Sequence, residues 1–170
     1  MMKQQYNDKY SQYNVITNYA KAGSLNLTRV FFIVSSSTAS ASELVINNLT
    51  PFMDVKLIGR SNTYGKPVGF FAIPVGDWYI FPVSFKTVNK NGESNYFSGF
   101  TPNAIVADGL DKDFGDVTEA SLASAIKFIT TGAYRLSSAP VYQEAPEVTK
   151  GNNVLDLPEF KGTVSERKFK

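Results

Sequence analysis

A cluster of small hydroxyl side chains lies between an apolar run and a segment with helical periodicity. The run Val30–Val34 is β-branched and aromatic, which predicts a buried strand. Ser40 falls at the start of the helix predicted to follow. The apolar positions at helical spacing are Ala41, Leu44, Val45, Leu49 and Phe52. The free amides and positive dipole end of a helix N-terminus can stabilise an oxyanion beside a nucleophilic serine.

Ser40 and Glu43 also fit a role that needs no chemistry. The spacing Ser-x-x-Glu is that of a capping box, and serine is among the preferred N-cap residues. The turn by itself therefore leaves helix capping and catalysis both open.

A second segment follows the predicted helix. Val55–Gly59 predicts a short strand that ends in glycine, and Tyr64-Gly65-Lys66 comes soon afterwards. This order of a strand, a Thr-Ala-Ser-Ala-Ser-Glu turn, a helix, a strand with glycine and an aromatic-Gly-Lys sequence resembles the catalytic core of the S41 peptidases. These are the carboxy-terminal processing or tail-specific proteases. The resemblance is best over residues 29–68 and extends more weakly to about residue 132.

The resemblance implies a role for three residues and a fold. Ser40 would be the nucleophile, Lys66 the general base, and the Ala41 N–H a donor to the oxyanion. The implied fold is α/β, the crotonase/ClpP-like fold of the S41 catalytic domain, of which this chain would be the carboxy-terminal part without a PDZ domain.

The residue types suit Ser-Lys chemistry. The chain contains no histidine, so a Ser-His-Asp triad made within it is excluded, whereas Ser-Lys is a known variant of the same arrangement. A lysine can act as a base when burial or a nearby cation lowers its pKa. Apolar neighbours expected to bury Lys66 are Tyr64, Pro67, Val68 and Phe70. The alternative is an ordinary solvated lysine in a hairpin.

The sequence departs from the family pattern in three places. One extra residue lies within Arg60–Thr63, which could shift the lysine, and Phe70 stands where the family often has a glutamine thought to orient the lysine. The upstream Asp-Leu-Arg-x-Asn-x-Gly-Gly segment, which supplies a second oxyanion amide, is not found. Loss of one such donor typically lowers turnover about a hundred- to a thousand-fold.

Composition limits the partners and cofactors. The 170 residues carry a net charge of +2, which gives no support for nucleic acid or an anionic membrane surface as a partner. Cysteine and histidine are both absent, so a zinc site would need carboxylates alone and is disfavoured, and no cofactor is expected. No apolar run approaches membrane-spanning length and no signal peptide is recognised, which leaves the compartment open, although the family is usually found in the cell envelope or periplasm.

Three regions are predicted along the chain. Residues 1–24 form a polar arm in which Tyr6, Tyr10 and Tyr13 have helical spacing. Residues 25–132 form the S41-like core, and residues 133–170 form a loosely packed tail with one short docked strand, Val154–Leu157.

Within the core, the stretch from Phe70 to Val88 is predicted to be rich in strands. Pro74–Asp77 predicts a turn, and the alternating aromatic and apolar side chains after it predict one buried face. These side chains are Tyr79, Phe81, Val83 and Phe85. An edge strand near the site could pair with the backbone of a peptide substrate, as the family's does.

An acidic loop, Asp108–Asp116, precedes the last predicted helix. Clustered carboxylates suit calcium, but the EF-hand order is missing, so a solvated loop is favoured. Asp116 and Glu119 predict the cap of the helix and Gly132 its end. Its apolar face would be Leu122, Ala125, Ile126 and Ile129.

Two functions follow from these observations. The chain is either a serine endopeptidase of Ser-Lys type that cleaves extended or unfolded polypeptides, or a non-catalytic S41 fragment that binds peptides or a partner chain. A lipase-like esterase is disfavoured, because the turn is not Gly-x-Ser-x-Gly and histidine is absent. Apolar surface left open by the missing upstream part predicts a homo-oligomer.

Overall fold

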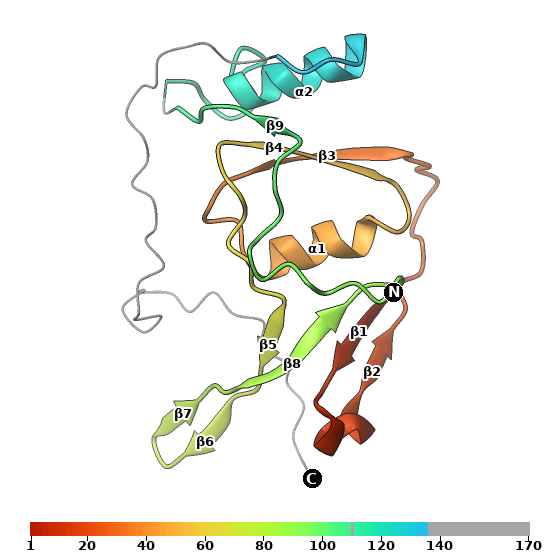
Figure 1. The fold of residues 1–170 in the computed structure, drawn as a ribbon, viewed down its shortest axis with the longest axis vertical. Helices are drawn as coiled ribbons and strands as arrows, with labels where there is room; N and C mark the ends of the chain where they lie inside the picture. Colours follow the sequence, from red (N-terminus) through yellow and green to blue (C-terminus); the bar gives the residue numbers. More distant parts are fainter. Residues whose placement is uncertain (110, 136–170) are drawn as a thin grey trace.

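The computed structural model describes residues 1–109 and 111–135, and in them strands and helices are mixed along the chain (Figure 1). The strands are β1 (Met2–Gln5), β2 (Val15–Thr17), β3 (Arg29–Val34), β4 (Asp54–Gly59), β5 (Val68–Phe70), β6 (Ile73–Val75), β7 (Trp78–Ile80), β8 (Val83–Val88) and β9 (Ala104–Ile105). The helices are the 3-10 helix η1 (Asp8–Tyr13) and the α-helices α1 (Ala41–Leu49) and α2 (Ala120–Thr131). Within these residues the sheets have the strand orders β2-β1-β8-β5, β3-β4-β9 and β6-β7.

A parallel strand-helix-strand unit positions the serine turn. β3 and β4 pair in parallel, with Val30 opposite Val55 and Val34 opposite Gly59, and α1 connects them. A parallel pair requires such a crossover. β9 continues the sheet in parallel, with Ala104 opposite Ile58. The predicted strands and the helix start at Ala41 are confirmed.

The sheet β3-β4-β9 has a hydrophobic core on each face, because successive side chains of a strand point to opposite sides. Leu57 packs with Val34 and Ile46, on the α1 side. Ile58 packs in a second cluster that includes Ala125 of α2. Figure 1 shows the sheet between the two helices.

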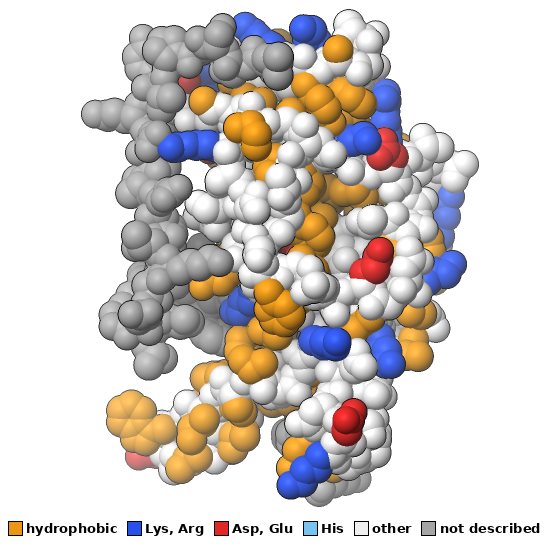
Figure 2. Space-filling view, in the orientation of Figure 1, with side chains coloured by type: hydrophobic (Ala, Val, Ile, Leu, Met, Phe, Trp, Pro, Cys, Tyr) orange, Lys and Arg blue, Asp and Glu red, His pale blue; other side chains and the backbone are white. Residues whose placement is uncertain are grey.

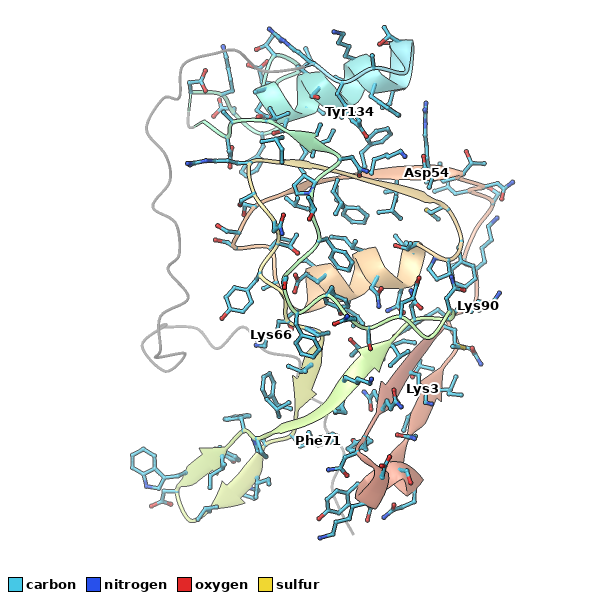
Figure 3. All side chains as sticks on the ribbon, in the orientation of Figure 1. Lys3, Asp54, Lys66, Phe71, Lys90 and Tyr134 are labelled. Carbon is cyan, nitrogen blue, oxygen red and sulfur yellow. The ribbon has the colours of Figure 1, made fainter. Side chains whose placement is uncertain are left out.

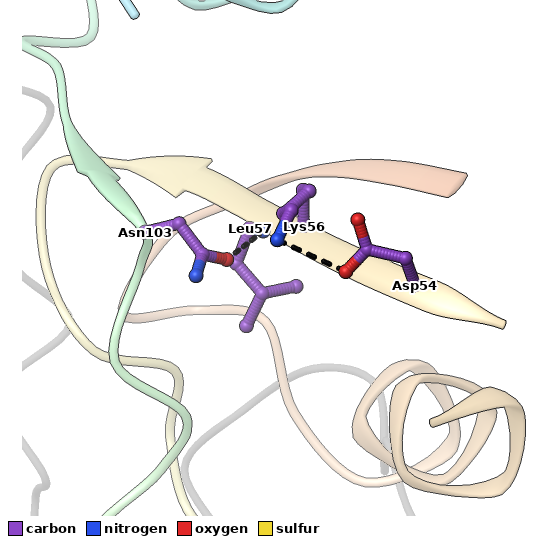
Figure 4. Close-up of polar contacts among 4 residues, drawn as sticks. All are labelled: Asp54, Lys56, Leu57 and Asn103. Atoms are coloured by element: carbon purple, nitrogen blue, oxygen red, sulfur yellow. Dashed lines mark hydrogen bonds and ion pairs between the residues drawn. The ribbon is translucent and has the colours of Figure 1, made fainter. Parts of the chain in front are cut away.

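A side chain replaces part of the backbone ladder where the chain enters β9. The Leu57 N–H donates to Asn103 Oδ1 at 2.7 Å, and the Asn103 N–H donates to the Leu57 carbonyl at 2.8 Å (Figure 4). On the same strand, Lys56 Nζ lies 2.9 Å from Asp54 Oδ1. Asn103 thus holds the incoming chain against β4.

The burial seen in β3 and α1 differs from the apolar pattern of the sequence. Ile33 is 53% exposed, because β3 lies at the edge of its sheet. The buried face of α1 consists of Glu43, Ile46 and Asn47, whereas Val45 is exposed. Asn47 Nδ2 donates to the Glu93 carbonyl at 3.0 Å, and the partners of Glu43 are described below.

Residues 1–24, predicted to be a polar arm with tyrosines at helical spacing, form β1, η1 and β2. β1 pairs with β8, with Gln4 opposite Thr87. The Tyr6 ring lies 5.9 Å from the Phe71 ring and 5.6 Å from the Phe85 ring, measured between centroids. This part of the chain is therefore joined to the sheet by a strand and an aromatic cluster.

The β6/β7 hairpin projects from the end of the β5/β8 ribbon (Figure 1). Its turn at Gly76–Asp77 confirms the predicted turn. Phe85 is buried as expected, but Tyr79 is 64% and Val83 64% exposed, so the predicted buried face was wrong at these positions. The alternating side chains do not share one strand, because Tyr79 lies in β7 and Val83 and Phe85 lie in β8, which belongs to a different sheet. Hydrophobic side chains accordingly gather over the hairpin at the lower left of Figure 2.

The N-cap residue of α2 is Glu119, three residues after Asp116, where the cap was predicted to begin. The Glu119 carboxylate accepts hydrogen bonds from the Ser121 and Leu122 N–H groups, whereas Asp116 accepts from Thr118. Gly132 ends the helix in the left-handed conformation, as predicted. The buried face is Ser121, Ser124 and Ala125. Ile126 and Ile129, which were expected on this face, are exposed. The predicted strand Val154–Leu157, and most of the predicted tail, lie outside the described residues.

Candidate functional site

Ser40 occupies the turn between β3 and α1 in an unusual backbone conformation. It is the N-cap residue of α1, with φ 51° and ψ −108°, and only 7% of it is exposed. Positive φ is uncommon for a residue other than glycine and costs conformational energy. A strained strand-to-helix turn is a recurrent way to present a nucleophilic serine.

The Glu43 carboxylate, which is fully buried, connects this turn to the loop before β5. Its Oε2 accepts hydrogen bonds from the Ser40 N–H at 3.1 Å and the Lys66 N–H at 2.8 Å. Its Oε1 accepts from the Gly65 N–H at 2.7 Å and the Thr63 hydroxyl at 2.5 Å. Each carboxylate oxygen thus has two donors, which satisfies a buried charge. We refer to Glu43 and these four partners as the Glu43 cluster.

The Glu43 cluster brings the main chains of Ser40 and Lys66 together. Because both amides donate to one oxygen atom, their nitrogens lie no farther apart than the sum of the two hydrogen-bond lengths. The Tyr64 N–H also donates to the Thr38 carbonyl at 2.9 Å. Figure 3 places Lys66 between the N-terminal end of α1 and the start of β5. The extra residue within Arg60–Thr63 is therefore compatible with a lysine beside the serine turn.

Close backbone contacts fix the loop that carries Lys66. Thr63 exchanges hydrogen bonds with Phe100, whose N–H donates to Thr63 Oγ1 at 2.7 Å and whose carbonyl accepts from the Thr63 N–H at 3.1 Å. A Cβ at Gly99 would lie 1.9 Å from the Thr63 carbonyl oxygen, and Gly99 has φ +76°. Gly65, with φ +90°, would clash similarly with the Phe97 carbonyl oxygen. Both positions therefore require glycine.

The Lys66 side chain is partly buried, and this burial lowers the pKa of its ammonium, while the nearby Glu43 carboxylate raises it. Pro67 is buried, and its carbonyl accepts from the Thr87 N–H at 2.8 Å. Lys66 Nζ lies 4.7 Å from the centroid of the Phe70 ring. An aromatic ring thus contacts the lysine from position 70.

Ala41 is the first residue of α1 and is exposed. Amides of the first helical turn have no acceptor within the helix, so the Ala41 N–H is suited to bind an anion. The predicted site residues Ser40, Ala41 and Lys66 therefore lie around one helix end, and their roles in a reaction stay predictions.

Sequence reasoning missed the central position of Glu43. The capping-box spacing predicted its contact with the Ser40 N–H, which the structure confirms. Its bonds to Thr63, Gly65 and Lys66 come from a loop distant in sequence. The one sequence signal that Glu43 would be buried was its place on a helix with apolar periodicity rather than in a solvated loop.

The described residues contain no group of three His, Cys, Asp or Glu side chains that could hold a metal ion. Across the same residues, neither α-helix has the length and apolarity needed to cross a membrane.

Comparison with known proteins finds solved structures of similar fold but no family assignment. The crystal structure described as "Putative S41 protease from Bacteroides fragilis NCTC 9343" superposes with a TM-score of 0.64 at 26% sequence identity. The match covers 76% of this chain and 36% of that chain, so this chain spans about a third of its neighbour. No family model matches the sequence, and no curated protein matches it significantly. The mixed strand and helix architecture and this neighbour support an S41-like relationship.

Proposed function

We propose that this chain carries the nucleophile and base of an S41-like serine peptidase that acts on extended or unfolded polypeptides. The observation that carries the proposal is the shared Glu43 oxygen, which holds the Ser40 and Lys66 amides together across the sequence. The proposed S41-like unit spans residues 25–132, and its proposed fold is the carboxy-terminal part of a crotonase/ClpP-like domain.

In the proposed reaction, the neutral amine of Lys66 takes the Ser40 hydroxyl proton while Oγ forms a bond to the substrate carbonyl carbon. The Ala41 N–H donates to the resulting oxyanion. The Lys66 ammonium then returns the proton to the leaving amine nitrogen as the peptide bond breaks. Water hydrolyses the acyl-enzyme by the same steps. Burial supports this role for Lys66, because it lowers the pKa of the ammonium.

A second candidate is a module that binds peptides or a partner chain without cleaving them. Ser40 is only 7% exposed and pairs with Glu43 in a capping box, an arrangement that also serves a helix with no reaction to perform.

Hydrolysis of casein, together with labelling by a fluorophosphonate, distinguishes the two. The variant is Ser40→Ala, and the matched control is Ser42→Ala, which removes an exposed hydroxyl two residues along the same helix. The peptidase predicts labelling and cleavage that disappear with Ser40→Ala and persist with Ser42→Ala. Absence of both from the unaltered chain would overturn the catalytic proposal and favour the binding module.

A further inference from the structure

The ring of Phe70 faces the amine of Lys66. Lys66 Nζ lies 4.7 Å from the ring centroid, within the distance of about 6 Å at which an aromatic face attracts a cation. Both side chains are half-buried. Partial removal from water strengthens such an attraction relative to an exposed pair.

An irregularity in the pairing of β5 with β8 determines the direction in which the Phe70 ring points. In the β5/β8 ladder Gly69 lies opposite Phe85 but Phe70 lies opposite Val83, so the register shifts between Gly69 and Phe70. Bulges of this kind redirect a side chain and are common near active sites. A Cβ at Gly69 would lie 2.2 Å from the Phe85 ring, so the strand is packed directly against that ring. The position of Phe70 is thus set by a bulge and by close packing.

We propose that Phe70 is the positioning residue for Lys66, whose ring face holds the lysine amine beside the Ser40 turn and favours its charged form. The inference rests on the proposed function for its catalytic consequence. The ring attracts an ammonium but not a neutral amine, so it opposes the effect of burial on Lys66. The fraction of Lys66 able to act as a base is then set by burial, which lowers the pKa of the ammonium, against the Phe70 ring and the Glu43 carboxylate, which favour the charged form.

The test weakens the negative face of the ring without changing its shape, by placing 3,4,5-trifluorophenylalanine at position 70 in the full chain. The readout is the pH dependence of Ser40 labelling by a fluorophosphonate. Loss of the attraction leaves more Lys66 neutral, so labelling on the acidic side of the profile rises about two- to five-fold, and the profile moves to lower pH. Phe70→Tyr, which keeps an aromatic face, should retain the original profile.

Phe52→Leu is the matched control. It removes another cation–ring contact, between Lys90 Nζ and the Phe52 ring at 5.0 Å, from an exposed pair outside the Glu43 cluster. Its profile should equal that of the unaltered chain. An equal shift in this control, or an unchanged profile in the fluorinated protein, would overturn the assignment.

A second measurement separates this inference from the proposed function. The titration of Lys66 is followed by NMR of ¹³Cε-labelled lysine in the Ser40→Ala background, with the resonance assigned by its loss in Lys66→Met. Fluorination should lower the titration midpoint whether or not the protein is an enzyme. If Ser40 is never labelled but this midpoint moves, the peptidase proposal fails and the ring contact stands. If the midpoint does not move, the role of Phe70 is refuted.

Discussion

The Glu43 cluster and the β6/β7 hairpin distribute polar and apolar groups in opposite ways. In the cluster, a fully buried carboxylate has four hydrogen-bond donors, three of them main-chain amides. In the hairpin, Trp78 is 79% and Ile80 54% exposed, and the strands pair only with each other among the described residues. The cluster is held by long-range contacts, whereas the hairpin is shaped by its local turn. Changes to buried polar groups should therefore affect stability far more than changes to exposed apolar ones.

The largest effect is expected from Glu43→Gln. The new amide N–H₂ group would face donors, and at least one buried N–H or hydroxyl would lose its acceptor. We expect the free energy of unfolding to fall by about 3 kcal/mol or more, as when one partner of a buried charged network is removed. Urea denaturation followed by circular dichroism measures it.

Glu93→Gln is the control for Glu43→Gln. Glu93 is exposed and accepts a hydrogen bond from Asn89 Nδ2 at 2.7 Å. A change within about 0.5 kcal/mol is expected there, as for most surface substitutions. Equal losses in the two variants would show that burial of the Glu43 carboxylate is not the determining factor.

Alanine substitution at two glycines compares the regions directly. Gly99→Ala places a Cβ 1.9 Å from the Thr63 carbonyl oxygen, so the loop carrying Lys66 must move. Gly76→Ala, at the hairpin turn, has similar positive φ but nothing within 4 Å. We expect losses of unfolding free energy of about 3 kcal/mol and about 1 kcal/mol, because only the first combines a clash with backbone strain. Thermal and urea unfolding of both variants give the difference, and equal losses would contradict the packing argument.

Trp78→Ser examines the exposed side of the contrast. Little burial is lost, so unfolding free energy should change by less than about 0.5 kcal/mol. We propose that the hairpin contributes to self-association, so the mass measured by light scattering should fall toward that of one chain. Leu25→Ser, an exposed apolar position outside the hairpin, is the control. A single-chain mass for the unaltered protein would contradict the proposed association.

The smallest effect is a pH dependence caused by Lys66. Burial lowers the pKa of this ammonium below 10.5, so between the folded pKa and 10.5 the unfolded chain binds more protons than the folded one. Stability should therefore rise with pH across that window and show no such change below it. Lys66→Met removes this titrating group. The difference in unfolding free energy between the two proteins, measured by urea denaturation across this pH range, isolates the contribution of Lys66. A difference that falls with rising pH would mean that attraction to Glu43 outweighs burial.

Local patterns predicted the elements that position the site. The apolar run at Val30, the helical spacing after Ser40 and the glycine at 59 gave the order β3, α1 and β4. Turn chemistry also gave the hairpin at Gly76 and the helix end at Gly132. These features depend on residues close together in the sequence, which is why the sequence alone reveals them.

Burial depended on partners that local patterns do not contain. Glu43 can be buried because Thr63, Gly65 and Lys66 donate hydrogen bonds to its oxygens. A polar face of α1 therefore points toward the protein interior. Tyr79 was predicted to share a buried face with Phe85, but it lies in the separate strand β7 and is exposed. The cap at Glu119 differs from the predicted one because Asp116 bonds locally to Thr118.

Three of the four donors to Glu43 are main-chain N–H groups, which every residue except proline possesses. The hydrogen bonds to Glu43 therefore depend on the backbone, the Glu43 carboxylate and the Thr63 hydroxyl, not on the side chains of Ser40 or Lys66. Exchange of either side chain leaves the main-chain N–H donors to Glu43 in place. Because these bonds do not require the proposed catalytic side chains, a homologue that has lost both of them would still keep this local structure.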